Sequence, residues 1–292
     1  MNAIPTTPPR PLDVTALFPQ LAPLARTATR LHPRPGSPTP HDSSVGGPLL
    51  WPARQPWPTC DKWHEGPVSP LVPVAQLYAR DVPLLRMPGR ADLLQVLWCP
   101  SEHPPEYKPP TALFWQVAAE VTNVLAAPPK PSEVEYDCYL PEPCVLAPEQ
   151  ITEYPNFLAL SEELQEQLTD WSVWQATGVV DDSYETDPEE FYMNEVSVAP
   201  GWKVGGWPPW GLTDPVARFC VGCGTAMNPL LTVPTGEWHA DNVGWAPYED
   251  QALAERDKGQ RVSNPTRVQI SRGNNLQLYG CPEFHSHTDL IQ

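Results

Sequence analysis

LQVLWCP at residues 94–100 is followed much later in the chain by LQLYGCP at residues 276–282. Both copies contain Leu-Gln, three further residues and Cys-Pro, and in both a histidine follows the proline after two intervening residues. The chain has seven histidines among 292 residues, so a histidine stands at any one chosen offset about once in forty positions. The matching histidines, His103 and His285, therefore indicate an internal duplication.

The match between the two copies extends towards the N-terminus of each half. Each half has a Val-Gly-Gly stretch with proline and tryptophan close by: Val45-Gly46-Gly47-Pro48 and Val204-Gly205-Gly206-Trp207-Pro208. A cysteine then follows at nearly the same spacing, Cys60 in the first half and Cys220 in the second. This shared order predicts that the two halves contain the same succession of structural elements.

Each half also supplies four candidate metal ligands in two short pairs. A cysteine followed three or four positions later by cysteine or histidine can turn both side chains towards one ion, and a second pair from a distant turn can complete a tetrahedron. The two predicted zinc sites are Cys60, His64, Cys99 and His103 in the first half, and Cys220, Cys223, Cys281 and His285 in the second. His287 is an alternative to His285, because either histidine could reach back after Cys281. Four protein ligands leave no open position, so we expect both zinc ions to be structural.

Two of the seven cysteines, Cys138 and Cys144, have no nearby histidine and no counterpart in the repeat. They are interpreted as buried thiols. In a reducing compartment, cysteines serve more often as metal ligands, small apolar groups or reactive thiols than in disulfides. For the second site, a redox dithiol formed by Cys220 and Cys223, or cysteines that only pack in the core, are the alternatives to a metal.

The composition indicates a folded chain built from short elements. Its 41% hydrophobic residues suffice for a core, and its 41 prolines favour ordered turns over long helices, which argues against an all-helical protein. The formal charge of -17 makes nucleic acid and anionic membranes unexpected partners. No apolar run approaches the roughly 18 residues of a membrane span, and the N-terminal stretch lacks the apolar core of a signal peptide. A cytoplasmic location is therefore expected.

Hydrophobic patterning predicts an α+β fold with mainly antiparallel strands, an N-terminal helix and a helix near residues 161–175. Short apolar runs at 71–78, 93–98 and 112–124 are interpreted as strands, although the third also fits a helix. Asp13 can cap an N-terminal helix, which Pro19 and Pro23 would break. The apolar face of that helix would carry Leu17, Leu21, Leu24, Ala28 and Leu31.

These elements divide the chain into four predicted parts. They are a proline-rich segment with a helix at 1–34, a first β-rich half at 35–125, a connecting segment with a helix at 126–195, and a second β-rich half with zinc-ribbon-like ligands at 196–292.

The residues assembled so far resemble the YwqG-like family of bacterial proteins of unknown function. The resemblance covers most of residues 35–292 and rests on the Gly46-Gly47 turn and on Lys203-Val204-Gly205-Gly206-Trp207-Pro208. The cysteine-rich stretch at 220–227, with Leu230-Leu231-Thr232 after it, is similar to an actinobacterial-type branch of that family. The resemblance implies a cytoplasmic α+β protein rich in antiparallel strands. It implies no assigned reaction and no catalytic residues.

The sequence favours a non-enzymatic binding or interaction protein with two structural zinc ions and an unknown protein or peptide partner. The proline and tryptophan residues where the halves meet, Trp207 and Trp210 among them, are the predicted contact surface. One alternative is a metal-dependent hydrolase with an open zinc site, for which His103 would be the missing ligand. A thiol redox sensor that uses Cys220 and Cys223 is the other alternative.

Overall fold

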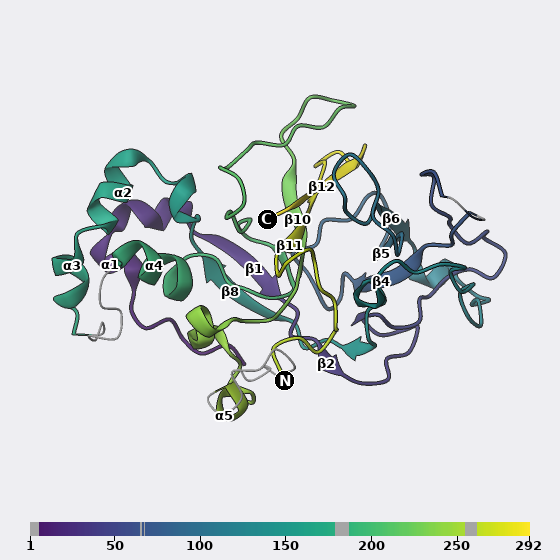
Figure 1. Cartoon of the computed structure of the whole chain (residues 1–292), viewed down its shortest axis with the longest axis horizontal. Helices are drawn as coiled ribbons and strands as arrows, with labels where there is room; N and C mark the ends of the chain where they lie inside the picture. Colours follow the sequence, from purple (N-terminus) through teal and green to yellow (C-terminus); the bar gives the residue numbers. More distant parts are fainter. Residues whose placement is uncertain (1–5, 65, 67, 179–186, 255–261) are drawn as a thin grey trace.

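The computed structural model describes residues 6–64, 66, 68–178, 187–254 and 262–292. In this part of the chain it contains two six-stranded sheets and a set of short helices (Figure 1). All paired strands in both sheets are antiparallel. The predicted α+β class with two β-rich halves is confirmed.

The N-terminal sheet consists, in spatial order, of β2 (Arg34–Pro35), β7 (Cys144–Val145), β3 (Ser44–Val45), β4 (Val72–Tyr78), β5 (Leu93–Trp98) and β6 (Thr111–Gln116). The C-terminal sheet consists of β12 (His287–Ile291), β11 (Asn275–Gly280), β10 (Asn228–Pro234), β9 (Lys203–Gly205), β1 (Arg26–Arg30) and β8 (Glu149–Glu153). The sheets therefore correspond strand by strand when one is read in reverse.

Four consecutive strands follow the same path in both sheets, β3 to β6 in one and β9 to β12 in the other. Both paths also contain a shift in strand register at the equivalent place. The register of β4 against β5 shifts between Pro73 and Ala75, and that of β10 against β11 shifts between Pro229 and Leu231. Proline cannot donate a hydrogen bond to a neighbouring strand, so a bulge beside it is expected. A bulge at the same place in both halves supports the duplication.

The repeated Leu-Gln motif places a buried glutamine on the strand next to the terminal strand of each sheet. Gln95 on β5 pairs with Gln76 on β4, and its side-chain amide donates to the Gln76 Oε1 atom over 2.9 Å. Gln277 on β11 pairs with Thr232 on β10 and accepts its hydroxyl hydrogen over 2.6 Å. Buried amides need such partners. The motif thus supplies a buried cross-strand hydrogen bond to both sheets, with the glutamine as donor in one and as acceptor in the other.

Each sheet also contains one strand from the other half of the chain. β1 lies between β9 and β8 in the C-terminal sheet, and β7 lies between β3 and β2 in the N-terminal sheet. Counted along the chain, β1–β6 and β7–β12 are two sets of six strands in which the first strand has been exchanged. β7 and β8 both lie within residues 126–195, the segment expected to connect the halves. Neither sheet is complete without strands from both sets.

One hydrophobic core lies between the two sheets and takes side chains from both. Val96 and Trp98 come from the N-terminal sheet, and Val204 and Leu278 come from the C-terminal sheet; all belong to one buried cluster. Of the predicted strands, 71–78 and 93–98 are confirmed as β4 and β5. The run at 112–124 is strand only at its start, where β6 lies, and it continues into a short 3-10 helix, η2 (Ala118–Glu120).

The predicted N-terminal helix is broken as expected but ends earlier than expected. It consists of α1 (Val14–Leu17), capped by Asp13, and the 3-10 helix η1 (Pro19–Leu24). The extension of its apolar face to Ala28 and Leu31 was wrong, because residues 26–30 form β1. Pro23 interrupts helical hydrogen bonding, and β1 instead pairs with strands on both of its sides.

The helix expected near 161–175 is confirmed in two pieces, α2 (Glu162–Leu168) and α3 (Trp171–Gln175). The break arises because the Asp170 carboxylate accepts the Ser172 N–H and starts a new helix. These helices pack with α1, α4 (Pro188–Phe191) and the π-helix η5 (Tyr192–Val196) in a second core at one end of the molecule (Figure 1). The remaining helices are η3 (Asp137–Tyr139), η4 (Phe157–Ala159), η6 (Ala240–Trp245) and α5 (Gln251–Ala254).

A buried ion pair explains the Lys-Val-Gly-Gly-Trp stretch of the second half. Lys203 Nζ lies 2.6 Å from Glu153 Oε1, and both side chains are fully buried. The same carboxylate accepts the backbone N–H groups of Ala199 and Trp207. Gly206 has a φ of +69°, and a Cβ atom there would collide with this carboxylate. The glycine is thus required by the close approach of a charged group.

None of the helices in the described part of the chain combines the length and the apolar character that crossing a membrane requires.

Candidate metal centres

Strand pairing brings the predicted ligands together. In the N-terminal sheet, Val72 at the start of β4 lies opposite Trp98 at the end of β5. The loop before β4, which carries Cys60, therefore lies beside the turn after β5, which begins with Cys99. In the C-terminal sheet, Asn228 lies opposite Gly280 and has the same effect on the corresponding loop and turn. Both centres thus stand at the same end of equivalent strand pairs.

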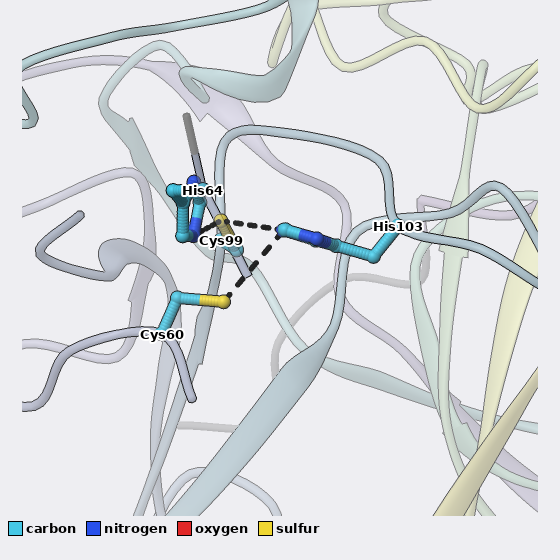
Figure 2. Close-up of side chains that lie close together, drawn as sticks. All are labelled: Cys60, His64, Cys99 and His103. Atoms are coloured by element: carbon cyan, nitrogen blue, oxygen red, sulfur yellow. Dashed lines mark hydrogen bonds between the residues drawn. The ribbon is translucent and has the colours of Figure 1, made fainter. Parts of the chain in front are cut away.

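The first centre joins Cys60, His64, Cys99 and His103 (Figure 2). His103 Nε2 lies 3.7 Å from Cys60 Sγ and 3.5 Å from Cys99 Sγ. His64 Nε2 lies 3.7 Å from Cys99 Sγ. Both cysteines are buried, and both histidines lie within reach of at least one sulfur atom.

Local hydrogen bonds hold this arrangement. The Cys60 N–H donates to the Ser69 carbonyl over 2.9 Å, closing the loop that carries His64. The Cys99 N–H donates to the Pro110 carbonyl over 3.0 Å, and the His103 N–H donates to the Lys108 carbonyl over 3.3 Å. The loop between β5 and β6 is thus folded back as a small hairpin that presents His103 to the two sulfur atoms.

The distances fit a tetrahedral ion. With sulfur at about 2.3 Å and nitrogen at about 2.0 Å from the ion, the edges of a tetrahedron are about 3.6 Å between sulfur and nitrogen and about 3.8 Å between two sulfur atoms. Three of the four sulfur–nitrogen distances of the first centre are 3.7, 3.5 and 3.7 Å. In each centre all four ligand atoms lie within 4.8 Å of one another.

The second centre joins Cys220, Cys223, Cys281 and His285. Cys223 Sγ lies 3.6 Å from Cys281 Sγ, and Cys281 Sγ lies 3.9 Å from His285 Nδ1. In each of its two turns, a backbone N–H also donates a hydrogen bond to a sulfur atom. Gly222 donates to Cys220 and Glu283 donates to Cys281, both over 3.4 Å. Such donors stabilise a thiolate, the form that binds a metal.

The structure distinguishes His285 from His287. His285 belongs to the second quartet, whereas His287 lies on β12 and contacts the other sheet. Its Nε2 atom lies 3.1 Å from the Thr111 hydroxyl and 3.2 Å from the Thr111 carbonyl oxygen.

The surroundings of the thiols differ between the two centres. Burial raises the pKa of Cys99 to about 12, and the nearby charge of a Cys60 thiolate acts in the same direction. Two buried thiolates at this place therefore need a cation. In the second centre, hydrogen bonds from Thr225 lower the pKa of Cys223 to about 7, and the Ser286 hydroxyl lowers the pKa of Cys220. Burial lowers the pKa of His103, which favours the neutral imidazole that coordinates metals.

The two cysteines outside these centres differ in exposure. Cys144 is fully buried, and its thiol donates to the Pro265 carbonyl over 3.5 Å. Burial raises its pKa to about 12. Cys138 is half-buried at the edge of the core between the sheets. The buried-thiol interpretation is thus confirmed for Cys144 and holds only partly for Cys138.

A cleft of about 610 Å³ is lined by residues that neighbour both centres. Lys108 Nζ lies 2.9 Å from an Asp289 carboxylate oxygen, and Arg218 donates to the Asp289 carbonyl oxygen over 3.0 Å. Sequence reasoning missed these groups, because they come from three separate loops and strands with no common spacing. Lys108 belongs to the first half and Asp289 to the second, so their ion pair joins the two halves at this cleft.

The tryptophans beside the glycine turns do not form an open aromatic surface. Trp51 and Trp202 are each 1% exposed and Trp210 is 8% exposed. Trp207 is half-buried beneath the Arg26 guanidinium, whose carbon lies 3.4 Å from the ring centroid. Trp51 packs against the Trp57 and Phe114 rings, and Trp202 belongs to the core between the sheets.

No protein-family model matches the chain. No curated protein matches it either. The resemblance to the YwqG-like family stays a prediction from the residues. The described residues contain two Cys/His quartets that could each hold a metal ion.

Proposed function

We propose that this chain is a non-enzymatic binding protein whose two sheets are each fastened by one structural zinc ion. The observation that carries the proposal is the closure of both quartets: four protein ligand atoms lie together at each centre, within 4.8 Å of one another.

Zinc is the ion that suits these ligands. Two sulfurs with two imidazoles, or three sulfurs with one imidazole, in a tetrahedral arrangement are typical of structural zinc sites. Magnesium and calcium prefer oxygen ligands, which neither quartet contains.

A structural role is favoured over a catalytic one because four protein ligands leave no position for water. The hydrolase alternative requires His103 to be absent from the first centre. His103 instead lies within 3.7 Å of Cys60 Sγ and within 3.5 Å of Cys99 Sγ, which supports its role as the fourth ligand. The redox alternative requires Cys220 and Cys223 to be free of metal.

Each zinc ion would join a loop that has little regular structure to a turn that follows a central strand. In the described part of the chain, the loop from Trp51 to Leu71 contains only isolated bridge contacts, and the 206–227 segment is similar. Zinc binding at such a place contributes directly to folding free energy.

We retain a protein or peptide as the proposed partner. The strongly acidic chain would attract a basic partner by electrostatic steering, which weakens as salt rises. Because Trp210 is buried and Trp207 is half-buried, the contact surface proposed on these rings is withdrawn.

The test is elemental analysis of protein purified without added metal. The proposal expects about two zinc ions per chain, one for each four-ligand centre. A folded protein with a value near zero would exclude the structural zinc and would favour the thiol redox alternative. A value near one, tied to either quartet by Cys→Ser variants, would restrict the proposal to that centre.

A further inference from the structure

A cavity of about 580 Å³ opens between the C-terminal sheet and β6, next to the second metal centre. Its walls include Val204 on β9, Leu230 on β10, and Leu113 and Trp115 on β6. The turn that carries Cys281 and His285 closes one side, where the Phe284 ring meets the Trp115 ring edge to face at 5.6 Å. Cavities of this size hold small organic ligands.

The cavity exists because the duplication is asymmetric at one position. Trp98 and Gly280 are counterparts, since each directly precedes the repeated Cys-Pro and ends the equivalent strand. Trp98 is fully buried in the core between the sheets, and its indole N–H donates to the Tyr139 carbonyl over 2.8 Å. Gly280 has no side chain to fill the corresponding space, and it lines the cavity.

Gly280 is not required by the backbone. A Cβ atom built on it would meet only Leu230, at an ordinary contact distance of 3.6 Å. Its φ is not among the positive values that favour glycine. The backbone conformation at this position therefore does not require glycine. The absence of a side chain leaves an open cavity.

The cavity combines apolar walls with two arginines. Leu85, Leu113, Trp115 and Leu230 provide aliphatic and aromatic surface, and Arg26 and Arg86 line the same space. Both arginines are exposed, and neither takes part in an ion pair within the described residues.

In a chain with 18 basic and 35 acidic residues, these two arginines line the same space. An apolar space with guanidinium groups that have no carboxylate partner suits an apolar ligand that carries one anionic group. The Arg26 guanidinium also stacks on the Trp207 ring.

We propose that this cavity binds a small monoanion with an aromatic or aliphatic body, such as an organic carboxylate, with the body against Trp115 and Leu230 and the anionic group towards Arg26 and Arg86. The inference deepens the proposed binding function and rests on it, because the second metal centre holds the turn that closes the cavity.

The test uses two fluorescent probes with the same aromatic body. 8-Anilinonaphthalene-1-sulfonate carries an anionic group, and N-phenyl-1-naphthylamine lacks it. Titration of the folded, full-length protein is expected to give one saturable site, with the anionic probe bound about tenfold more tightly because its charge is paired. Equal or tighter binding of the neutral probe would overturn the proposal. Competition by 1-naphthoate, measured as loss of probe fluorescence, is expected to show that the site also binds a carboxylate. Failure of 1-naphthoate to compete would count against the proposal.

Variants locate the site. Gly280→Trp restores the side chain found in the other half and is expected to weaken both probes about tenfold or more by filling the cavity. The double variant Arg26→Gln/Arg86→Gln is expected to weaken only the anionic probe. Arg90→Gln, on the same loop as Arg86 but outside the cavity, is the matched control and should behave as the parent.

If Gly280→Trp does not fold, the arginine variants still decide, because their side chains are exposed. Parent-like affinity of the anionic probe in the double variant would refute the proposal. Zinc content is measured on the same samples, so loss of the zinc hypothesis and loss of the cavity hypothesis are separate results.

Discussion

Thr111 on β6 and His287 on β12 stand at equivalent positions of the two halves and contact each other, with 3.1 Å between Thr111 Oγ1 and His287 Nε2. Thr111 pairs with Trp98 and His287 pairs with Gly280, the last residue before each repeated Cys-Pro. Equivalent positions of the two edge strands therefore face each other where the duplicated halves meet.

This contact also explains how two sheet edges are protected. β6 and β12 are the terminal strands of their sheets, and exposed terminal strands can pair with other chains. Here the Thr111 hydroxyl also donates to the Asp289 carboxylate, and Lys108 pairs with the same carboxylate. The two edges thus cover each other through side chains.

Loss of one metal ligand should destabilise the protein far more than loss of a buried thiol outside the centres. Cys281→Ser is expected to lower Tm on the order of 10 °C and to remove one equivalent of zinc, because zinc binding contributes folding free energy. Cys144→Ser is the control, since Cys144 is fully buried but contacts only the Pro265 carbonyl with its thiol. It should keep the zinc and lose only a few degrees. If the two variants melt alike, Cys281 does not bind a stabilising metal.

The buried pair of Lys203 and Glu153 should show strong coupling. Lys203→Met alone is expected to cost about 3–5 kcal/mol, because it leaves the Glu153 carboxylate buried without its cation. The double variant Lys203→Met/Glu153→Gln removes both charges and should recover part of that loss. Chemical denaturation measures both free energies. A double variant less stable than Lys203→Met would show that the carboxylate matters mainly through its bonds to Ala199 and Trp207.

Acid should destabilise the fold through His32. Its side chain is fully buried, and burial lowers its pKa from 6.5 to about 4 despite the Glu149 carboxylate at 3.2 Å. The unfolded chain therefore binds a proton at this histidine between pH 6.5 and pH 4, whereas the folded chain does not. The associated stability is present above pH 6.5 and is lost as pH falls to 4, with a total of at most about 3 kcal/mol.

Comparison with His32→Asn separates this contribution from acid release of zinc, which affects both proteins equally. The difference includes the effect of His32 on Glu149: against the effect of burial, hydrogen bonds from His32 and Thr7 lower the pKa of Glu149 to about 2. Asparagine tolerates the positive φ of 43° at this position. The free energy of unfolding of the parent should fall more steeply than that of the variant between pH 6.5 and 4. Parallel pH profiles would mean that His32 does not contribute.

The sequence predicted the metal centres better than it predicted the paths of the strands. The Cys and His spacings are local, and β4–β5 and β10–β11 pairing then brings the two pairs of each centre together. The strand exchange could not be predicted, because nothing in residues 26–30 or 144–145 says which sheet they join. Ala28 illustrates the error: its spacing fits a helix face, but pairing with both β8 and β9 decides its conformation.

The cavity could not be predicted from the sequence, although the residue difference that produces it lies within the repeated motif. LQVLWCP and LQLYGCP differ at the residue before Cys-Pro, where Trp98 stands in one copy and Gly280 in the other. The duplication is predicted from what the two copies share, not from this difference. The difference gains meaning only when both residues are known to end equivalent strands beside one core.

The two zinc ions should leave the protein at different rates. Cys223 and His285 are exposed, whereas in the first centre both cysteines and His103 are buried and His64 is half-buried, so a chelator reaches the second centre first. Release to 4-(2-pyridylazo)resorcinol, followed by absorbance, is expected to show a fast and a slow phase of equal amplitude. Cys223→Ser should abolish the fast phase and leave the slow one unchanged. A single phase in the parent, or a fast phase that persists in Cys223→Ser, would contradict this assignment, because accessibility would then not distinguish the two centres.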